Sequence, residues 1–332
     1  MKVLIDHPNP FFLNHGGFQI QIEQTHAALR QIGVDVDYLR WWDDRQSPDI
    51  IHYFGRPSIP YIQQAQAKRI RIVMAQLLTG VGSRSARALR FQKTAIRLAR
   101  ASLPRMVTYP FGWDVFEQVD ASIALTPWEA HLMTYLFGAP REKVHVVGNG
   151  VEEAFLQSQP APRGPWLVCT VTIVERKRVL ELAEAAVLAK TPVWIIGKPY
   201  AASDPYAERF QALARQSPQL VRYEGAISDR TQLARIYREA RGFALLSTME
   251  SLSLSALEAA ACECPLLLSD LPWARGTFKE DASYCPVASP AQIAPYLRRF
   301  YDAAPQLKIP SNPPSWAEIA GQLKKVYEKI LK

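Results

Sequence analysis

The chain has 332 residues, more than one hydrophobic core usually organises, so its length predicts about two domains. Hydrophobic residues make up 48% of it and charged residues 21%, which is ordinary for a soluble globular protein and excludes a disordered or low-complexity chain. The net charge of +8 favours an anionic partner, such as a nucleotide, a phosphorylated acceptor, a membrane face or a nucleic acid.

The first residues of the chain, 1–6, have the pattern of a short strand and not that of a signal peptide. No segment approaches the roughly 20 apolar residues that span a bilayer. We therefore expect a cytoplasmic protein. Cys262 and Cys264 are close enough to join a metal site. However, Cys169 and Cys285 lack zinc-type spacing and no His lies nearby, so four buried thiols are the favoured interpretation.

Short apolar runs alternate with helical patterns along the first half of the chain. This alternation predicts a parallel sheet with helices on both faces. In chain order we expect a strand at 3–5, a helix at 19–32, strands at 34–39 and 50–54, a helix at 59–67, a strand at 71–75, a long basic helix near 85–103, a strand at 121–125, a helix at 128–137 and a strand at 144–147.

The pattern breaks between Phe155 and Trp166, where three prolines and a glycine indicate a linker. A second proline-rich break follows at 310–314, before a terminal helix at about 316–330. Between the two breaks we expect strands at 167–172, 193–196, 221–223, 243–246 and 266–269, and helices at 179–189, 206–215, 231–240 and 255–261.

These elements predict two doubly wound α/β domains of similar size. The first covers 1–155, a linker covers 156–165, the second covers 166–309, and a C-terminal helix at 310–332 packs back toward the first. Ligands of such sheets bind outside the carboxyl ends of the strands, so we expect two facing domains with a cleft between them.

Gly16 and Gly17 precede the first helix and are candidates for phosphate binding, because paired glycines let a backbone approach a ligand and a helix N-terminus offers free N–H groups. A flexible turn is the alternative. Arg176, Lys177 and Arg178 follow the first strand of the second half, where they would neutralise a diphosphate. A solvated charge run is the alternative, and this segment taken alone slightly favours it.

The richest segment is 248–258, which joins a strand to a helix of small residues. Its three alternating serines can cap the helix and leave N–H groups directed at an anion. Glu250 in the loop and Glu258 in the helix would then bind sugar hydroxyls on either side of that anion. Ser255 and Glu258 also fit a capping box, so Glu258 has a structural interpretation of equal weight.

Glu250 and Glu258 are separated by seven residues and followed by a run of small residues and Pro265. This pattern resembles the E-x7-E signature of retaining glycosyltransferases of family four. Further segments resemble the family in the same order along the chain. They are Gly16-Gly17, Asp49-Ile50-Ile51-His52, Val146-Val147-Gly148-Asn149-Gly150-Val151-Glu152 with Phe155, Arg176-Lys177, and the strand ends Ile195-Ile196-Gly197 and Tyr223-Glu224-Gly225.

The resemblance implies a GT-B fold, with two facing Rossmann-like domains: an acceptor-side first domain and a second domain that binds a UDP- or GDP-linked sugar. It implies that Glu250 contacts the transferred sugar and that Arg176 and Lys177 stabilise the leaving diphosphate, an electrostatic role. It further implies retention of configuration without a metal or other cofactor, and a polysaccharide, lipid-linked or small-molecule acceptor. The remaining donor contacts that it implies are Gly16, Gly17, Gly197, Gly225, the backbone of Ser251, Leu252, Ser253 and Leu254, and Glu258 at the ribose.

The chain departs from the family pattern in three places. Ser251 and Ser253 replace two glycines, and an expected Arg after the first strand of the second half is absent. The family's His after the strand at 71–75 is also missing; Gln76 stands there and is a candidate sugar contact in its place. These departures leave a catalytically inactive nucleotide-sugar-binding protein of the same fold as the alternative to an enzyme.

The segment 84–100 carries a cation at every third or fourth residue, with apolar residues between them, and 83–113 contains no acidic residue. On a helix this spacing places the cations largely on one side and the apolar residues on the other. A solvated helix face is one interpretation; binding to an anionic membrane surface or lipid-linked acceptor, at the inner face of the membrane, is another. Nucleic acid ranks last, because stacking aromatic residues are lacking.

Overall fold

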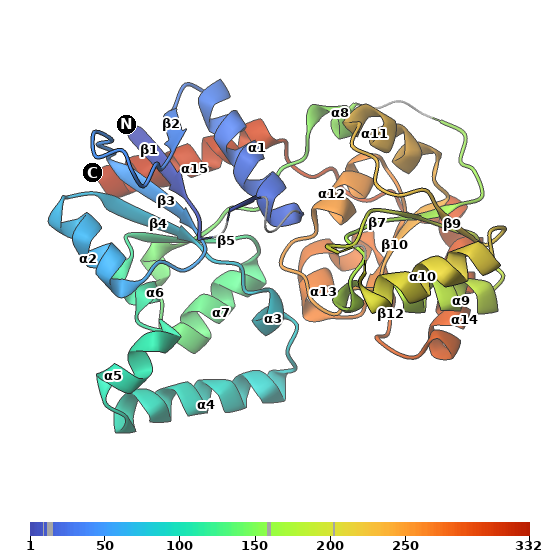
Figure 1. Cartoon of the computed structure of the whole chain (residues 1–332), viewed down its shortest axis with the longest axis horizontal. Coiled ribbons are helices and arrows are strands. Elements are labelled where there is room, and N and C mark those ends of the chain that lie inside the picture. Colours follow the sequence, from blue (N-terminus) through green and yellow to red (C-terminus); the bar gives the residue numbers. More distant parts are fainter. Residues whose placement is uncertain (9, 12–15, 158–160, 202) are drawn as a thin grey trace. The chain divides into compact units, whose positions relative to one another are not determined.

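The computed structural model describes residues 1–8, 10–11, 16–157, 161–201 and 203–332 (Figure 1). The chain divides into two compact units. One comprises Met1–Asn149 with Trp316–Lys332, and the other Gly150–Ser315. Each unit contains a parallel six-stranded sheet, so the expected α/β class with two Rossmann-like domains is confirmed.

The sheet of the first unit has the strand order β2-β1-β3-β4-β5-β6. Val3 of β1 pairs with Val36 on one side and Ile50 on the other, so the chain order reverses at β1. All five residues of β3 are buried, as expected of a strand with helices on both faces. The strands are β1 (Lys2–Asp6), β2 (Asp35–Tyr38), β3 (Ile50–Phe54), β4 (Arg71–Ala75), β5 (Ala121–Ala124) and β6 (Val144–Val146).

Helices cover this sheet, and one of them comes from the far end of the chain. The helix α15 (Trp316–Leu331) buries an apolar face that includes Leu323 and packs against α1. Its Tyr327 hydroxyl shares a 2.7 Å hydrogen bond with Nδ1 of His52 in β3. The other helices of this unit are α1 (Gly17–Gln31), α2 (Ile59–Ala67), α3 (Thr79–Gly82), α4 (Ala86–Ser102), α5 (Arg105–Thr108), α6 (Val115–Gln118) and α7 (Pro127–Phe137), with the 3₁₀ turns η2 (Tyr109–Phe111) and η3 (Arg141–Lys143).

The sheet of the second unit has the order β12-β11-β10-β7-β8-β9, and its chain order reverses at β7. The core of this unit is built from the apolar strands and the small-residue faces of the helices. Its strands are β7 (Leu167–Thr170), β8 (Val193–Ile196), β9 (Val221–Tyr223), β10 (Gly242–Leu245), β11 (Leu266–Ser269) and β12 (Ser283–Cys285). Its helices are α8 (Glu153–Leu156), α9 (Val179–Leu188), α10 (Pro205–Gln216), α11 (Arg230–Glu239), α12 (Leu254–Ala261), α13 (Pro272–Phe278) and α14 (Pro290–Ala303), with η4 (Glu175–Lys177), η5 (Lys279–Asp281) and η6 (Ala304–Gln306).

The strand β12 and the helix α14 were not expected from the sequence. Pro295 stands inside α14, where proline removes a backbone donor and normally ends a helix. Ser289 and Gln292 form a capping box at its start, and Ile293 and Leu297 are buried on the side that packs against α9. Capping and burial therefore outweigh the proline.

The expected linker, 156–165, behaves as part of the second unit where it is described; 158–160 lie outside the described residues. The guanidinium of Arg163 donates to the carbonyls of Ala240 at 2.9 Å and Glu263 at 2.7 Å. The amide of Gly164 donates to the carbonyl of Glu239 at 2.7 Å. These bonds attach the segment to the ends of α11 and α12. The division between units falls at Asn149 and Ser315.

All four cysteines are free and buried, which confirms their interpretation as buried thiols. Burial raises the pKa of Cys169 and of Cys264 to about 12. Over the described ranges, no group of three or more His, Cys, Asp or Glu side chains is placed to hold a metal ion. Within the same ranges, no helix combines the length and apolar character needed to cross a bilayer.

Candidate functional site

The candidate site of the second unit lies where its strand order reverses. β7 has β8 on one side and β10 on the other. After β7 the chain continues to β8 on one side of the sheet, and after β10 it continues to β11 on the other side. Ligands of doubly wound sheets bind at this point, outside the carboxyl ends of the strands. The segments that follow these two strands contain Arg176 and Lys177 in one case and Glu250 in the other.

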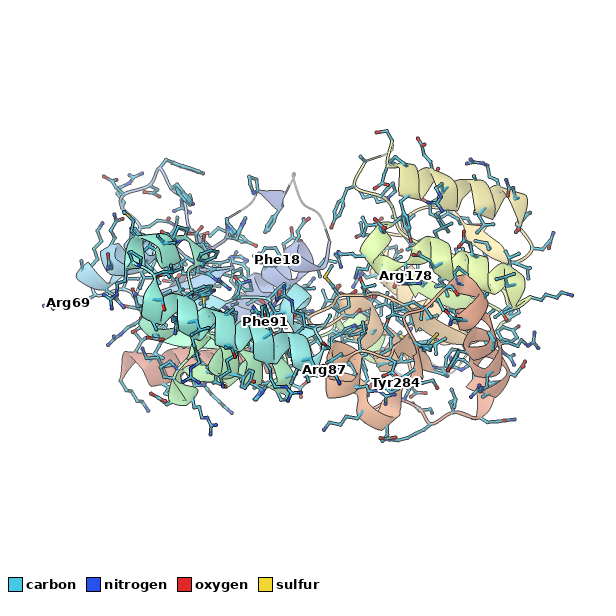
Figure 2. All side chains as sticks on the ribbon, turned by 90° about the horizontal axis from the view of Figure 1, so that it is seen from below. Phe18, Arg69, Arg87, Phe91, Arg178 and Tyr284 are labelled. Atoms are coloured by element: carbon cyan, nitrogen blue, oxygen red, sulfur yellow. The ribbon has the colours of Figure 1, made fainter. Side chains whose placement is uncertain are left out.

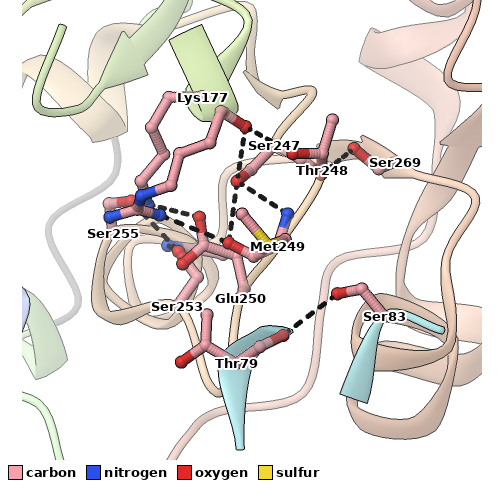
Figure 3. A network of polar contacts seen from close by, with 12 residues as sticks. Thr79, Ser83, Lys177, Ser247, Thr248, Met249, Glu250, Ser253, Ser255 and Ser269 are labelled. Atoms are coloured by element: carbon pink, nitrogen blue, oxygen red, sulfur yellow. Dashed lines mark hydrogen bonds and ion pairs between the residues drawn. The ribbon is translucent and has the colours of Figure 1, made fainter. Parts of the chain in front are cut away.

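Hydrogen bonds to the carbonyl oxygen of Arg176 join the two segments. Figure 3 labels Ser247, Thr248 and Met249 of this network. The amide of Thr248 donates to this oxygen at 2.8 Å and the Thr248 hydroxyl at 3.1 Å. In return, the Arg176 guanidinium donates to the carbonyl of Met249 at 3.3 Å. Behind them, the Ser269 hydroxyl donates to the carbonyl of Ser247 at 2.7 Å, which adds β11 to the network. The loops after β7 and β10 are therefore held to each other and to the end of β11.

Lys177 and Glu250 form an ion pair at this point, as Figure 3 shows. Their side chains are only 14% and 10% exposed. The structure thus brings together two residues that the sequence placed 73 positions apart. In this arrangement each charge neutralises the other. A ligand could replace the ion pair if its phosphate oxygens bound Lys177 and its hydroxyl groups bound Glu250, because neither buried charge would then be left unpaired.

The third cation of the run has a different environment. Arg178 adopts a left-handed backbone conformation (φ 54°) at the start of α9. Its guanidinium donates to the carbonyl of Ala288. Arg176 and Lys177 therefore contact the loop after β10, whereas Arg178 contacts the segment before α14, and the run is not a single solvated face.

The helix α12 begins one residue earlier than expected, and its cap differs from the expected one. Ser253 is the N-cap, and its hydroxyl accepts from the amide of Ala256 at 3.3 Å. The capping box of Ser255 and Glu258 is wrong, because Glu258 bonds instead to Arg230 of α11. Ser251 and Ser253 are both buried, and Leu252 and Leu254 lie on either side of the cap. The first turn of α12 therefore follows the Glu250 loop directly.

Arg230 was missed by sequence reasoning, yet it joins several parts of this unit. It forms ion pairs with Glu258 and, at 2.8 Å, with Glu152, and its guanidinium lies 4.7 Å from the ring centre of Phe155. Burial raises the pKa of Glu258, while the positive charge of Arg230 acts against this rise. Tyr237 donates to Glu258 at 3.4 Å. Glu258 is therefore a buried carboxylate that is paired with Arg230.

No sequence signal separated Arg230 from other surface arginines. It follows Asp229, whose carboxylate accepts from the amides of Thr231 and Gln232 and so caps α11. That pattern predicts a helix start and nothing about the side chain of Arg230. Its partners are 78 and 28 residues away in sequence, so only the fold brings them together.

Gly197 and Gly225 lie at the ends of neighbouring strands, and the amide of Gly197 donates to the carbonyl of Gly225 at 3.0 Å. Both have positive φ angles, 153° and 88°. A Cβ on Gly197 would lie 1.7 Å from the carbonyl oxygen of Val171, whereas a Cβ on Gly225 would meet no atom within 4 Å. Gly197 is therefore required by backbone packing, and Gly225 faces open space.

The remaining predicted site residues belong to the first unit. Gly16 is the N-cap of α1 with φ 134°, and its carbonyl accepts from the amide of Ile20 at 3.2 Å. Gly17 is the first residue of that helix. Gln76 directly follows β4, and its side-chain amide donates to the carbonyl of Leu77 at 2.7 Å. Each of the three therefore lies in a segment that follows a strand of this sheet.

Comparison with known proteins shows what the second unit resembles. Residues 151–315 match the family model of glycosyl transferases, group 1. This segment is almost the same as the unit Gly150–Ser315. The second unit is therefore similar to the group 1 glycosyltransferases. The D-inositol 3-phosphate glycosyltransferase of Jonesia denitrificans is 33% identical over 183 residues, which are 47% of this chain and 42% of that protein. The chain thus matches less than half the length of this curated relative.

Solved structures show the same fold over the entire chain. Sucrose-phosphate synthase from Thermosynechococcus elongatus matches with a TM-score of 0.70 at 18% identity, covering 100% of this chain and 99% of that one. A glycosyltransferase from Rickettsia africae gives 0.67 at 12% identity, with 100% and 99% covered. HepE from Anabaena in complex with UDP gives 0.64 at 13% identity, with 99% and 95% covered. The expected GT-B fold is confirmed.

Proposed function

We propose that this protein is a retaining glycosyltransferase that uses a nucleotide-sugar donor. The observation that carries the proposal is the ion pair of Lys177 and Glu250, which lies at the strand reversal of the unit that matches the group 1 glycosyltransferase model. A cation and a carboxylate side by side suit a ligand with a diphosphate next to a sugar. UDP is the first nucleotide to test, because a structure of the same fold contains it.

In this proposal the second unit binds the donor and each residue has one role. Lys177 and Arg176 stabilise the negative charge that develops on the departing diphosphate, which is often the largest catalytic contribution. Glu250 binds a hydroxyl of the transferred sugar, and Glu258 a hydroxyl of the ribose. The backbone amides of 251–254, at the start of α12, bind the diphosphate.

The first unit takes the acceptor side, and its Gly16, Gly17 and Gln76 complete the donor contacts. Transfer with retention and without metal is part of the proposal. The acceptor is a polysaccharide, a lipid-linked sugar or a small molecule, and the reaction takes place in the cytoplasm.

The test is release of nucleoside diphosphate from UDP- and GDP-sugars, with and without a chelator, alongside thermal shifts with the same ligands. Mass action raises the melting temperature when a ligand binds the folded state. We expect Lys177→Ala and Glu250→Gln each to lower the rate at least about 100-fold, the effect of removing one electrostatic contact from a transition state. Lys325→Ala and Glu208→Gln alter exposed residues of α15 and α10 and serve as matched controls.

Three outcomes would count against the proposal. Full activity of Lys177→Ala would show that the donor site lies elsewhere. A donor that raises the melting temperature but is never turned over would favour an inactive binding protein. A rate abolished by the chelator and restored by a divalent cation would contradict metal independence.

A further inference from the structure

The helix α4 exposes apolar side chains that the sequence predicted to lie on the side opposite its cations. Leu89 and Ile96 are buried against α7, as expected. Phe91 and Leu98, however, are 78% and 61% exposed. Figure 2 shows α4 on the near side of the first unit, with Phe91 and Arg87 labelled on it. The expected division into one basic and one apolar side is therefore wrong, because the outer face carries both kinds of residue.

The exposed residues of α4 lie in stripes along the helix. Phe91 and Leu98 are seven residues apart, which is about two turns, so they share one face. Ala95 lies between them at helical spacing and is exposed as well. Arg90 and Arg97, also seven residues apart, form a second stripe beside the first. With 17 residues, α4 offers this face over about 26 Å.

The outward cations of α4 differ from the inward ones. Lys93 lies 3.8 Å from the ring centre of Tyr135, and Arg100 pairs with Asp114 at 3.1 Å. Arg87 and Arg97 make no hydrogen bond or ion pair with any residue that the structure describes. The inward cations therefore attach the helix to its unit, while these outward cations remain available to an external partner.

The chain after α4 extends this surface. Met106 of α5 is 84% exposed, and further exposed apolar residues lie between the end of α4 and the end of η2. α5 adjoins α4 in Figure 1. No acidic residue stands between Asp49 and Asp114, although eleven lysines and arginines do. The further exposed apolar residues are Leu103, Val107, Tyr109 and Phe111.

From this combination we infer that the outer face of α4, continued by 103–111, docks on an anionic lipid surface. Apolar side chains of such a helix enter the boundary between headgroups and acyl chains, while its arginines bind lipid phosphates. A nucleic acid would use the arginines but would leave Leu98 and Met106 in water. An acidic protein could bind the arginines, but it has no acyl chains into which Phe91 and Leu98 could insert. The inference does not depend on the proposed catalytic activity.

The test is co-sedimentation of the full chain with vesicles of phosphatidylcholine, alone or mixed with phosphatidylglycerol. We expect binding to the mixed vesicles that weakens with added salt. Arg87→Glu with Arg97→Glu should lower the partition coefficient at least about five-fold for each residue, since one cation near an anionic membrane contributes about 1 kcal/mol. Phe91→Ser with Leu98→Ser should lower it about ten-fold, through lost apolar burial.

Two double variants on the second unit are matched controls: Arg209→Glu with Arg215→Glu on α10, and Leu188→Ser with Ile309→Ser at exposed apolar sites. Both should bind like the unaltered chain. Equal loss in the controls, or equal binding to neutral vesicles, would overturn the inference. The inference would also be overturned if the unaltered chain failed to bind vesicles but bound duplex DNA tightly, and if Phe91→Ser with Leu98→Ser left the DNA binding unchanged.

Discussion

At the scale of single residues, the sequence predicted most of the residue types of the candidate site, but it did not predict which side chains contact one another. Lys177 and Glu250 were identified because cations and carboxylates after strands suit a phosphate and a sugar, and the structure pairs them. Arg230 was missed, because no pattern in the neighbouring sequence predicts its ion pairs with Glu152 and Glu258. Ser253 replaced Ser255 as the cap of α12, since either serine fits the local pattern.

Gly197 and Gly225 provide a matched prediction at this scale. Gly197→Ala should lower the free energy of unfolding of the second unit by more than about 3 kcal/mol, because its Cβ would overlap the carbonyl oxygen of Val171. Gly225→Ala should cost only about 1 kcal/mol, since its positive φ is strained but its surroundings are open. Urea unfolding measures both; equal costs would contradict the geometry.

At the scale of elements, most strands were predicted to within a residue or two, because buried parallel strands are continuous apolar runs between turn residues. Elements whose signals conflict were missed. The helix α14 was missed because Pro295 lies inside it; its capping box and its buried face stabilise the helix despite this proline. In α4, helical spacing identified the helix but not its orientation, because the exposed Phe91 and the buried Leu89 have the same apolar character.

The ion pairs of Arg230 join α11, α12 and the segment before α8, and so belong to this scale. Arg230→Ala should lower the free energy of unfolding by about 2 kcal/mol; the loss is below that of a fully buried pair, because Arg230 is 29% exposed. Chemical denaturation measures it. Adding Glu258→Gln should recover part of the loss by removing the unpaired buried charge. A further loss in the double variant would show that Glu258 does not depend on Arg230.

At the scale of the whole molecule, composition and alternating elements were enough to predict two Rossmann-like domains, and the solved structures confirm the fold. The boundary was harder to predict. Prolines marked 156–165 as a linker, but the hydrogen bonds of Arg163 attach the described part of that segment to the second unit. The carbonyl groups that accept these bonds are far away in the sequence, so local composition cannot predict them.

His52 makes the stability of the first unit depend on pH. Burial lowers the pKa of its imidazole from 6.5 to about 3, and its Nε2 has no partner within the described structure. The unfolded chain therefore binds a proton that the folded chain excludes between these values. Stability is fully present above pH 6.5 and falls by roughly 1.4 kcal/mol per pH unit below it, down to about pH 3.

Melting temperatures at several pH values between 7.5 and 4.5 test this dependence. His52→Asn should flatten the decline on the acid side, whatever its effect at neutral pH. His131→Asn, at an exposed position on α7, should retain the decline of the unaltered chain. An unchanged slope in His52→Asn would show that other groups control acid unfolding.

The contact between Tyr327 and His52 also constrains the order in which the protein folds during synthesis. The first unit is discontinuous in sequence, since the whole second unit lies between β6 and α15. A growing chain therefore has every strand of the first sheet long before it has the helix that covers His52 and packs on α1. The second unit can finish folding on the ribosome, whereas the first must wait, with an uncovered apolar surface, until α15 has been synthesised and has left the ribosome. Chaperones would meet the nascent chain at that surface.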